Sequence, residues 1–406
     1  MKIAPSLGVL AAVVGLLGVT VAYAQVDCSD PNNLCTGDPC VIPSLTVANP
    51  CTADFTPRTV VIAGTVRIRS GVSLTAGTIR VEGSIESRDS SGPLHVTLAA
   101  TQDITVTGSI RFSPGPDTLT LSAGGSIDLA GIQLSTPRGY TTYFSAAAGG
   151  TLTVSGTIRA NGSHVSLSGA QGVTVNAPIY AATMGGFDDG IVQLSSASGG
   201  VVINDTISVP NHRNVTITAV AGEVQVSAAG DVVVNKSIRG YGPDIGAYIS
   251  LVSSGGDVTV NGRIMARREG HLTVQAAGVA TLNRRVRVSG NFSNTMGFGG
   301  AIVRVEAPSV VIAPGATIAG DAPANAGQFC FKATGGDLLL GGGLFARGGT
   351  GSPGNIEASA TGNLIAEGTF RVAPIGCIAL TAGGTLDTSA GSFDTALSPD
   401  CPLNCM

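Results

Sequence analysis

Apolar and polar residues alternate in short runs along most of this chain. Typical runs are "ITV" at 104–106, "LTV" at 152–154 and "VTV" at 258–260. A period of two places successive side chains on opposite faces of a β-strand, so each run predicts a strand with one buried and one exposed face. No segment after residue 24 has the period of an amphipathic helix. The pattern therefore predicts an all-β protein.

The alternating runs repeat with a mean spacing of about 25 residues between Ala63 and Thr388. In most copies a small or polar residue ends a run and precedes an Ile, Val, Leu or Phe by three positions, as in "ITVTGSI" and "LTVSGTI". Each repeat holds three short strands, for example "HLTVQAAG", "VATL" and "RRVRVSG" within 271–290. The chain is thus an array of some 14 equivalent units.

Strands this short form no stable hairpins without turn residues at regular hairpin spacing. When the units stack, each strand pairs in parallel with its equivalent one repeat later, and only the two ends keep unpaired edges. The expected fold is a single right-handed parallel β-helix of about 14 coils with three short strands per coil. At about 4.8 Å per coil the rod would be roughly 65 Å long.

Five consecutive repeats carry an asparagine directly after the second strand, as in "VTVNGRIMA" at 258–266. These residues are Asn176, Asn204, Asn235, Asn261 and Asn283. Asparagine tolerates the left-handed backbone of a tight turn better than other non-glycine residues. Equivalent asparagines about 4.8 Å apart can also bond amide to amide. The sequence predicts an internal asparagine ladder, with a row of surface ligands as the alternative.

The stretches "GGTLTVSGTI", "GGDVTVNGRI" and "GGDLLLGGGL" share one pattern of paired glycines followed by alternating apolar residues. Over about 59–395 this pattern resembles the right-handed parallel β-helix superfamily, and within it the haemagglutinin-like and autotransporter-passenger adhesins of bacterial surfaces. The resemblance implies an extracellular rod with a structural or adhesive role. The chain lacks the Asn-Pro-Asn-Gly secretion motif of some of these adhesins, so the resemblance covers the rod and not an export system.

Residues 1–24 have the features of a signal peptide: Lys2, an apolar run and the small-x-small site Ala22-Tyr23-Ala24. The run is too short and too rich in glycine to predict a membrane span. We expect a secreted protein, extracellular or on the cell surface, with the periplasm as an alternative. The expected segments are a signal peptide at 1–24, a cysteine-rich N-terminal cap at 25–58, the β-helix at 59–393 and a C-terminal cap or tail at 394–406.

Eight cysteines, an even number, are typical of an oxidising compartment. They form two terminal groups with two residues between them: Cys28, Cys35, Cys40 and Cys51; Cys330 and Cys377; Cys401 and Cys405. We expect two disulfides within the first group. The C-terminal pair is expected to bond to the two central cysteines or to itself. No histidine and no tight Cys-x-x-Cys pair lies near either terminal group, so no zinc site is predicted.

The link from the third strand of one coil to the first strand of the next varies in length. It is short at 69–71 and 267–270 but long at 181–190, 239–246 and 289–300. Insertions at one corner of a stacked repeat gather on one face, which is often a binding face. The candidate ligand- or glycan-binding residues on this variable-loop face are Asp188, Asp189, His212, Arg213, Tyr241, Asp244, Arg267, Arg268 and Glu269.

Two functional hypotheses follow from these features. The first is a non-catalytic extracellular or cell-surface protein, structural or adhesin-like, that binds polysaccharide or cell-surface glycan on the variable-loop face and has no cofactor. The alternative is a polysaccharide lyase or hydrolase resembling the pectin-lyase-like β-helix enzymes, in which paired carboxylates such as Asp188 and Asp189 bind calcium or act as acid and base. The signature motifs of polygalacturonases are missing, and no catalytic residue is predicted. End-to-end or lateral self-association is a third possibility.

Two further sets of residues recur at one position of the repeat. Arginines that follow the inward Ile of the third strand should point outward as a solvated stripe or as a basic track for anionic glycans: Arg80, Arg111, Arg159, Arg239, Arg287 and Arg371. Histidines His95, His164 and His271 start a first strand several coils apart, which indicates repeat ancestry and not a metal site. The net charge of −4 argues against nucleic-acid binding.

Overall fold

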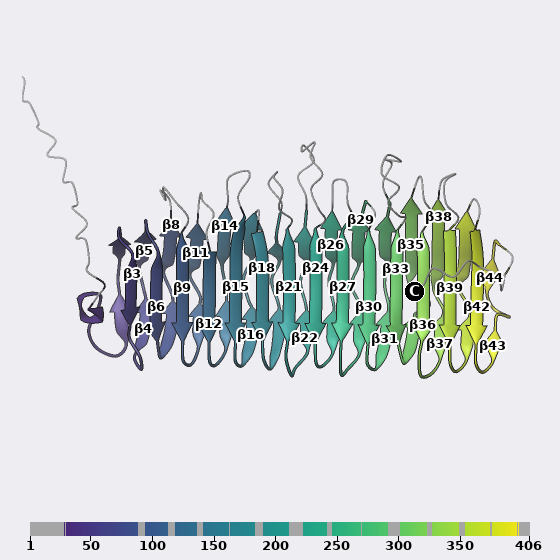
Figure 1. Ribbon diagram of the computed structural model, residues 1–406, viewed down its shortest axis with the longest axis horizontal. Coiled ribbons are helices and arrows are strands. Elements are labelled where there is room, and N and C mark those ends of the chain that lie inside the picture. Colours follow the sequence, from purple (N-terminus) through teal and green to yellow (C-terminus); the bar gives the residue numbers. More distant parts are fainter. Residues whose placement is uncertain are drawn as a thin grey trace, which may run out of the picture.

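The protein is a rod of stacked coils in which every strand runs parallel to its equivalent in the next coil (Figure 1). The computed structural model describes Cys28, residues 30–87, 94–112, 118–135, 141–161, 163–182, 190–210, 222–241, 246–268, 270–290, 301–322, 327–348, 354–373, 376–395 and Leu397. Each complete coil supplies one strand to each of three sheets, here called A, B and C in chain order. The predicted all-β parallel β-helix with three strands per coil is confirmed.

Sheet A has 15 strands, all of four residues or fewer. They are β1 (Cys40–Ile42), β4 (Thr59–Ile62), β7 (Thr78–Val81), β10 (Ile104–Val106), β13 (Ile127–Leu129), β16 (Thr151–Val154), β19 (Gly172–Val175), β22 (Val201–Ile203), β25 (Val232–Val234), β28 (Val258–Val260), β31 (Val279–Leu282), β34 (Ser309–Ile312), β37 (Leu338–Leu340), β40 (Leu364–Ala366) and β43 (Leu386–Asp387).

Sheet B also has 15 strands, and several of them carry an arginine. They are β2 (Leu45–Val47), β5 (Thr65–Ile68), β8 (Ser84–Ser87), β11 (Ser109–Phe112), β14 (Ile132–Ser135), β17 (Ile158–Asn161), β20 (Ile179–Tyr180), β23 (Ile207–Val209), β26 (Ile238–Tyr241), β29 (Ile264–Arg267), β32 (Val286–Ser289), β35 (Thr317–Ala322), β38 (Gly343–Gly348), β41 (Thr369–Ala373) and β44 (Ser392–Phe393).

Sheet C has 14 strands and is the widest of the three, with strands of six or seven residues from β9 onward. They are β3 (Cys51–Asp54), β6 (Val72–Ala76), β9 (His95–Ala100), β12 (Thr118–Ala123), β15 (Thr142–Ala148), β18 (Ser163–Gly169), β21 (Ile191–Ser196), β24 (Glu223–Ala228), β27 (Tyr248–Ser253), β30 (His271–Ala276), β33 (Ile302–Ala307), β36 (Gln328–Ala333), β39 (Gly354–Ala360) and β42 (Gly376–Ala382).

The first coil begins earlier in the chain than the repeat pattern indicated. Residues 40–54, which lie in the segment assigned to the N-terminal cap, form β1, β2 and β3. Cys40 pairs with Val60 on β4, so this coil is in register with the next. The 3-10 turn η1 (Pro31–Asn33) precedes it. Sheets A and B therefore contain one strand more than the 14 coils that the sequence predicted.

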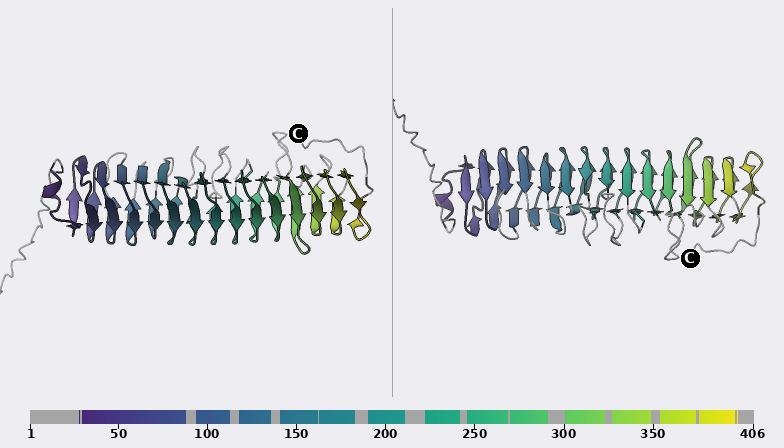
Figure 2. Two further views of the ribbon diagram at one scale, coloured as in Figure 1. Left: turned by 90° about the horizontal axis from the view of Figure 1, so that it is seen from below. Right: turned by 90° about the horizontal axis from the view of Figure 1, so that it is seen from above.

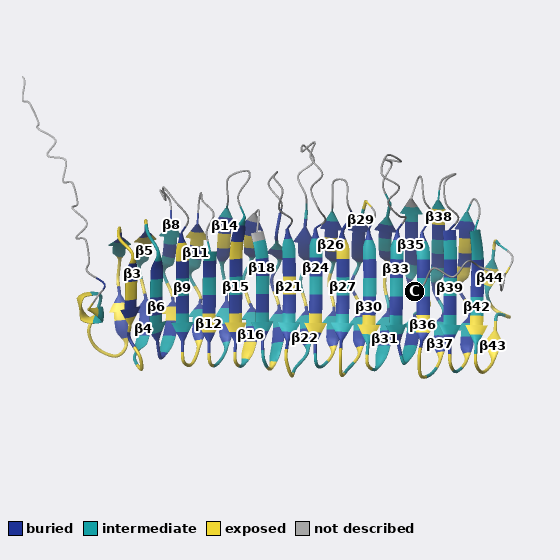
Figure 3. Cartoon of the chain, in the orientation of Figure 1, coloured by how far each residue is buried: buried dark blue, intermediate teal, exposed yellow. Residues whose placement is uncertain are grey.

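The core is one continuous column of inward-pointing aliphatic side chains along the rod. In the coil of β28, β29 and β30, for example, Val258, Ile264 and Leu272 are fully buried. The alternation of buried and more exposed positions repeats along every sheet (Figure 3), and the stacking continues along the whole length in two further views (Figure 2). Burial of each such side chain contributes about 1.5–3 kcal/mol, so stability accumulates coil by coil.

The cysteines at the N-terminus form two disulfides, as predicted: Cys28–Cys51 and Cys35–Cys40. Cys330 and Cys377 are also disulfide-bonded. Cys330 on β36 pairs with Glu357 on β39, and Cys377 on β42 pairs with Asn355 on that same strand, so the two cysteines are two coils apart. Cys401 and Cys405 lie outside the described residues.

Cys330→Ser is expected to release one reactive thiol per chain, at Cys401 or Cys405. Two coils separate the Cα atoms of Cys330 and Cys377 by about 9.6 Å along the rod, beyond the reach of about 6.8 Å that a disulfide allows. Alkylation of the unreduced, denatured variant followed by peptide mass spectrometry locates the thiol. The matched variant Cys377→Ser should release the other tail cysteine. A thiol at Cys377 in the first variant would contradict the expected pairing.

Candidate functional site

The five predicted asparagines form a continuous chain of side-chain hydrogen bonds across five coils. The Nδ2 atoms of Asn204, Asn235, Asn261 and Asn283 each donate to the Oδ1 atom of the preceding asparagine at 2.8–3.0 Å. The amide ladder itself is therefore present. Asparagine suits it because its side chain both donates and accepts, so the chain of bonds can continue through any number of coils.

The ladder lies on the outside of the rod, so the expectation of an internal ladder was wrong. Asn176, Asn204, Asn235 and Asn261 are exposed, and Asn283 is half-buried. Each asparagine directly follows an inward Val, Ile or Leu, and alternation then turns it outward. The left-handed backbone expected at these positions is also absent, because the only described non-glycine residue with positive φ is Arg268, at 60°.

Asn235→Ala is expected to lower the free energy of unfolding by about 1 kcal/mol. The change removes two amide bonds, to Asn204 and to Asn261, but both are exposed to water and contribute modestly. Asn283→Ala removes one ladder bond and should cost about half as much. Urea denaturation of both variants measures the difference. Equal free energies of unfolding for wild type and Asn235→Ala would show that the ladder does not contribute to stability.

A second ladder, which sequence reasoning missed, ties coils together through carboxylates. Asp231 Oδ1 accepts the backbone N–H of Asp257 at 2.9 Å, and Asp257 Oδ1 accepts that of Val279 at 2.7 Å. Asp337 accepts the N–H of Asn363 in the same way, at 2.7 Å. The signal in the sequence is an Asp after paired glycines, as in "GGD" at 255–257 and 335–337. These carboxylates therefore have a structural role, since each one bonds its own coil to the next.

Three of the nine predicted loop residues are described: Tyr241, Arg267 and Arg268. Tyr241 on β26 and Arg267 on β29 are direct partners across neighbouring coils. The guanidinium carbon of Arg267 lies 5.0 Å from the centroid of the Tyr241 ring, a cation–π contact. Arg268 is exposed. Asp188, Asp189, His212, Arg213, Asp244 and Glu269 lie outside the described residues.

The predicted outward stripe of arginines follows sheet B, with one exception. Arg111, Arg159, Arg239, Arg287 and Arg371 occupy outward positions of β11, β17, β26, β32 and β41. Arg80 belongs to β7 of sheet A, so its inclusion was wrong. The run "IRV" at 79–81 has the same local pattern as "IRF" at 110–112, and only the position in the coil distinguishes them.

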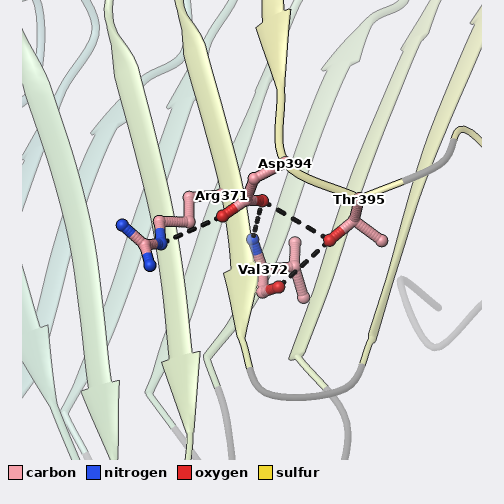
Figure 4. Close-up of polar contacts among 4 residues, drawn as sticks. All are labelled: Arg371, Val372, Asp394 and Thr395. Atoms are coloured by element: carbon pink, nitrogen blue, oxygen red, sulfur yellow. Dashed lines mark hydrogen bonds and ion pairs between the residues drawn. The ribbon is translucent and has the colours of Figure 1, made fainter.

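Carboxylates neutralise some of these arginines. Near the C-terminal end, Asp394 Oδ2 lies 3.0 Å from Arg371 Nε, and Asp394 Oδ1 accepts the backbone N–H of Val372 at 3.0 Å (Figure 4). The Thr395 hydroxyl donates to the Val372 carbonyl oxygen at 3.1 Å (Figure 4). These contacts fasten the last strand of sheet B to β41, so the role of Arg371 is structural.

Among the described residues, five arginines with a single carboxylate partner gather on the outer face of β26, β29 and β32. We call Arg239, Arg263, Arg267, Arg285 and Arg287 the arginine patch. Arg263 and Arg285 directly precede β29 and β32 in neighbouring coils, where the carbonyl oxygen of Arg285 accepts the N–H of Ile264. The patch therefore gathers five guanidinium groups from three successive coils.

Two apolar side chains complete the arginine patch. Met265 on β29 lies between Arg239 and Arg287 in one outward column and is only 3% exposed, as expected where long aliphatic stems flank it. Tyr241 stacks on the guanidinium of Arg267. The patch thus consists of guanidinium groups around a buried thioether and a half-buried phenol ring.

The charges of the arginine patch favour the binding of an anion. Asp321 is the only carboxylate within the described ranges that forms a salt bridge to it, at 3.4 Å from Arg287. The Nε atoms of Arg263 and Arg287 are buried and have no hydrogen-bond partner among the described residues. Partial burial, followed by the charges of Arg285, Arg239, Arg287 and Arg267, lowers the pKa of the Arg263 guanidinium. Guanidinium groups stay charged in proteins, so their mutual repulsion is relieved by a bound anion.

The described part of the chain has few other groups that are typical of metal-binding or catalytic sites. His95, His164 and His271 occupy one outward column of sheet C, with His164 three coils after His95 and His271 four coils after His164, so they share one position of the repeat and lie too far apart to bind one ion. No group of three or more His, Cys, Asp or Glu side chains in the described ranges is placed to hold a metal ion. No described segment forms a helix long and apolar enough to span a membrane.

Comparisons with known families, with curated proteins and with solved structures give no match.

Proposed function

We propose that this protein is a secreted, non-catalytic extracellular rod, structural or adhesin-like, that binds acidic polysaccharide through the arginine patch. The observation that carries the proposal is the set of five guanidinium groups on three successive coils with Asp321 as their one described carboxylate partner. In a protein of net charge −4, this positive surface is local and not a consequence of overall composition. The disulfides and the predicted signal peptide at 1–24 support export.

An acidic polysaccharide suits this geometry better than a small anion. Guanidinium groups in neighbouring coils recur about every 4.8 Å along the rod, so a polymer with a carboxylate or sulfate on each sugar could engage several at once. The planar fork of arginine binds carboxylates and sulfates with two parallel hydrogen bonds. The Tyr241 ring, already stacked on Arg267, adds an apolar surface for a sugar ring.

The enzymatic alternative depends on Asp188, Asp189 and their neighbours, which lie outside the described residues. Three described carboxylates of these coils have partners within the fold: Asp321 pairs with Arg287, and Asp231 and Asp257 accept backbone N–H groups of the next coil. No pair of free carboxylates faces the arginine patch in the described ranges, which favours binding without turnover.

A binding assay combined with a degradation assay tests the proposal. The exported protein is applied to immobilised polygalacturonate, alginate and heparin, and to the neutral polymers cellulose and mannan. We expect retention on at least one acidic polymer, elution by added salt, and no fall in polymer length. Equal retention on all five polymers would contradict the arginine patch as the site. Cleavage of polygalacturonate or alginate, with release of unsaturated ends, would establish the lyase alternative.

A further inference from the structure

Two tyrosine–histidine pairs lie on the outer face of sheet C, away from the arginine patch. Tyr143 on β15 and His164 on β18 are direct partners, with ring centroids 5.1 Å apart and an interplanar angle of 43°. Tyr248 on β27 and His271 on β30 are partners in the same way, at 4.6 Å and 22°. In both pairs the tyrosine is one coil before the histidine. The same two-residue arrangement therefore occurs twice.

Both pairs belong to one straight column of the sheet. The register passes from Tyr143 through His164, Ile191 and Glu223 to Tyr248. The two tyrosines are thus four coils apart, about 19 Å along the rod axis at about 4.8 Å per coil. A single sugar cannot contact both rings, whereas an extended polymer parallel to the rod can.

The tyrosines are unusually exposed for this molecule. Tyr143 is 51% exposed and Tyr248 is 39% exposed. Among the described residues the other exposed large apolar side chains are Val41, Leu386 and Leu397, which belong to the first and last coils or to the segment after them. The other large apolar side chains of the described residues are buried or half-buried. An exposed aromatic ring that recurs at one position of a repeat therefore indicates a contact surface.

The column of side chains next to this one is polar and uncharged. The adjacent outward column reads Ser145, Ser166, Gln193, Gln225, Ser250 and Thr273 in successive coils. Gln193 Nε2 donates to Gln225 Oε1 at 3.0 Å, and Gln225 donates in turn to the Glu223 carboxylate, the one charged group in this area. Burial lowers the pKa of the His271 imidazole, so that ring is neutral near pH 7. Hydroxyl and amide groups of this kind bond sugar hydroxyls.

We infer that the two Tyr–His pairs are stacking subsites for an extended polysaccharide of neutral sugars that runs parallel to the rod along sheet C. Each tyrosine ring packs against the apolar face of one sugar, and the serine and glutamine column bonds to sugar hydroxyls between the two subsites. This surface lies on sheet C and is largely uncharged, whereas the arginine patch lies on sheet B and is positively charged. The rod then has two binding faces, an anionic-polymer face on sheet B and a neutral-polymer face on sheet C.

The test replaces both tyrosines with isoleucine. Isoleucine already occupies this column at Ile191 and Ile302, so the strands accept it, while the flat ring is lost. Affinity gel electrophoresis measures binding to hydroxyethyl cellulose, xylan and galactomannan. We expect wild type to be retarded by at least one of them and Tyr143→Ile/Tyr248→Ile to bind it at least tenfold more weakly, with single variants intermediate. Tyr143→Phe/Tyr248→Phe keeps both rings and should bind like wild type.

Two controls separate this inference from the proposed function. Binding of the isoleucine double variant to polygalacturonate should equal that of wild type, because the arginine patch is unchanged. Tyr180→Ile removes an outward tyrosine of sheet B, beside Arg159, and should leave neutral-polymer binding intact. Unretarded wild type on all three neutral polymers, or equal retardation of wild type and the isoleucine double variant, overturns the inference. So does loss of binding in Tyr180→Ile as large as in the double variant.

Discussion

Replacing Arg239, Arg263 and Arg285 with glutamine is expected to weaken binding to polygalacturonate by at least about 100-fold. Each charge-assisted contact contributes about 1.5 kcal/mol or more, and each 1.4 kcal/mol corresponds to about a tenfold change in affinity. These three guanidinium groups have no carboxylate partner within the described ranges, so the substitution leaves no buried carboxylate unpaired. Because the substitution removes three of the like charges that repel one another in the patch, the variant should be at least as stable as wild type. Isothermal titration and thermal unfolding measure the two effects.

The matched control removes the same charge outside the patch. Arg111→Gln/Arg159→Gln/Arg347→Gln changes three outward positions of sheet B on β11, β17 and β38. The expected loss of affinity is under about threefold, because screening in physiological salt limits charge effects to within about 8 Å. If the control loses as much affinity as the patch variant, the polymer responds to total charge and the arginine patch is not a site.

Gly156→Ala is expected to lower the free energy of unfolding by about 3 kcal/mol. Gly156 lies in the turn between sheets A and B, and its N–H donates to the carbonyl oxygen of Leu129 in the preceding coil at 3.0 Å. A Cβ atom added there would lie 1.2 Å from the carbonyl oxygen of Ala130. That contact is with backbone, so the two coils must move apart, and each displaced coil loses pairing with its neighbour. Urea denaturation monitored by circular dichroism measures the loss.

Gly335→Ala is the matched control for this substitution. An added Cβ there meets nothing nearer than the Pro308 side chain at 3.5 Å, which is ordinary van der Waals contact. The control should remain within about 0.5 kcal/mol of wild type. Wild-type stability of Gly156→Ala would contradict the close approach of successive coils at this corner.

The stacking itself could be predicted because the signal for it is local. Alternation within "HLTVQAAG", "VATL" and "RRVRVSG" identifies three strands, and the structure places β30, β31 and β32 at those residues. The repeat then fixes which strand pairs with which, since equivalent segments differ by one coil. Neither step requires knowledge of distant contacts, which is why the fold class and the three-strand coil were both predicted correctly.

The direction of the side chains at the turns was harder to predict. An internal ladder was expected because equivalent asparagines one coil apart can bond amide to amide, but the alternation along the strand decides which way the side chain points. Val234 is buried, so Asn235 directly after it turns outward. The exposed amides bond to one another even so, because the coil spacing brings them within hydrogen-bond distance.

The arginine patch was only partly predicted. Arg239 and Arg287 were recognised as part of a stripe and Arg267 as a loop residue, while Arg263 and Arg285 were missed. Alignment on the ladder would have revealed them: Arg263 and Arg285 each lie two positions after a ladder asparagine. The repeat that identifies the strands also places all five arginines on one surface when it is followed across three coils.

The central claim is that the stacked coils bring arginines from separate repeats together so that they bind one polyanion. The dependence of the binding affinity on salt concentration tests this claim most directly. Binding of wild type to polygalacturonate should weaken steeply as salt rises, and the slope of log affinity against log salt should fall by about one unit for each patch arginine that contacts a charge and is replaced. Equal slopes for wild type and Arg239→Gln/Arg263→Gln/Arg285→Gln would contradict the account.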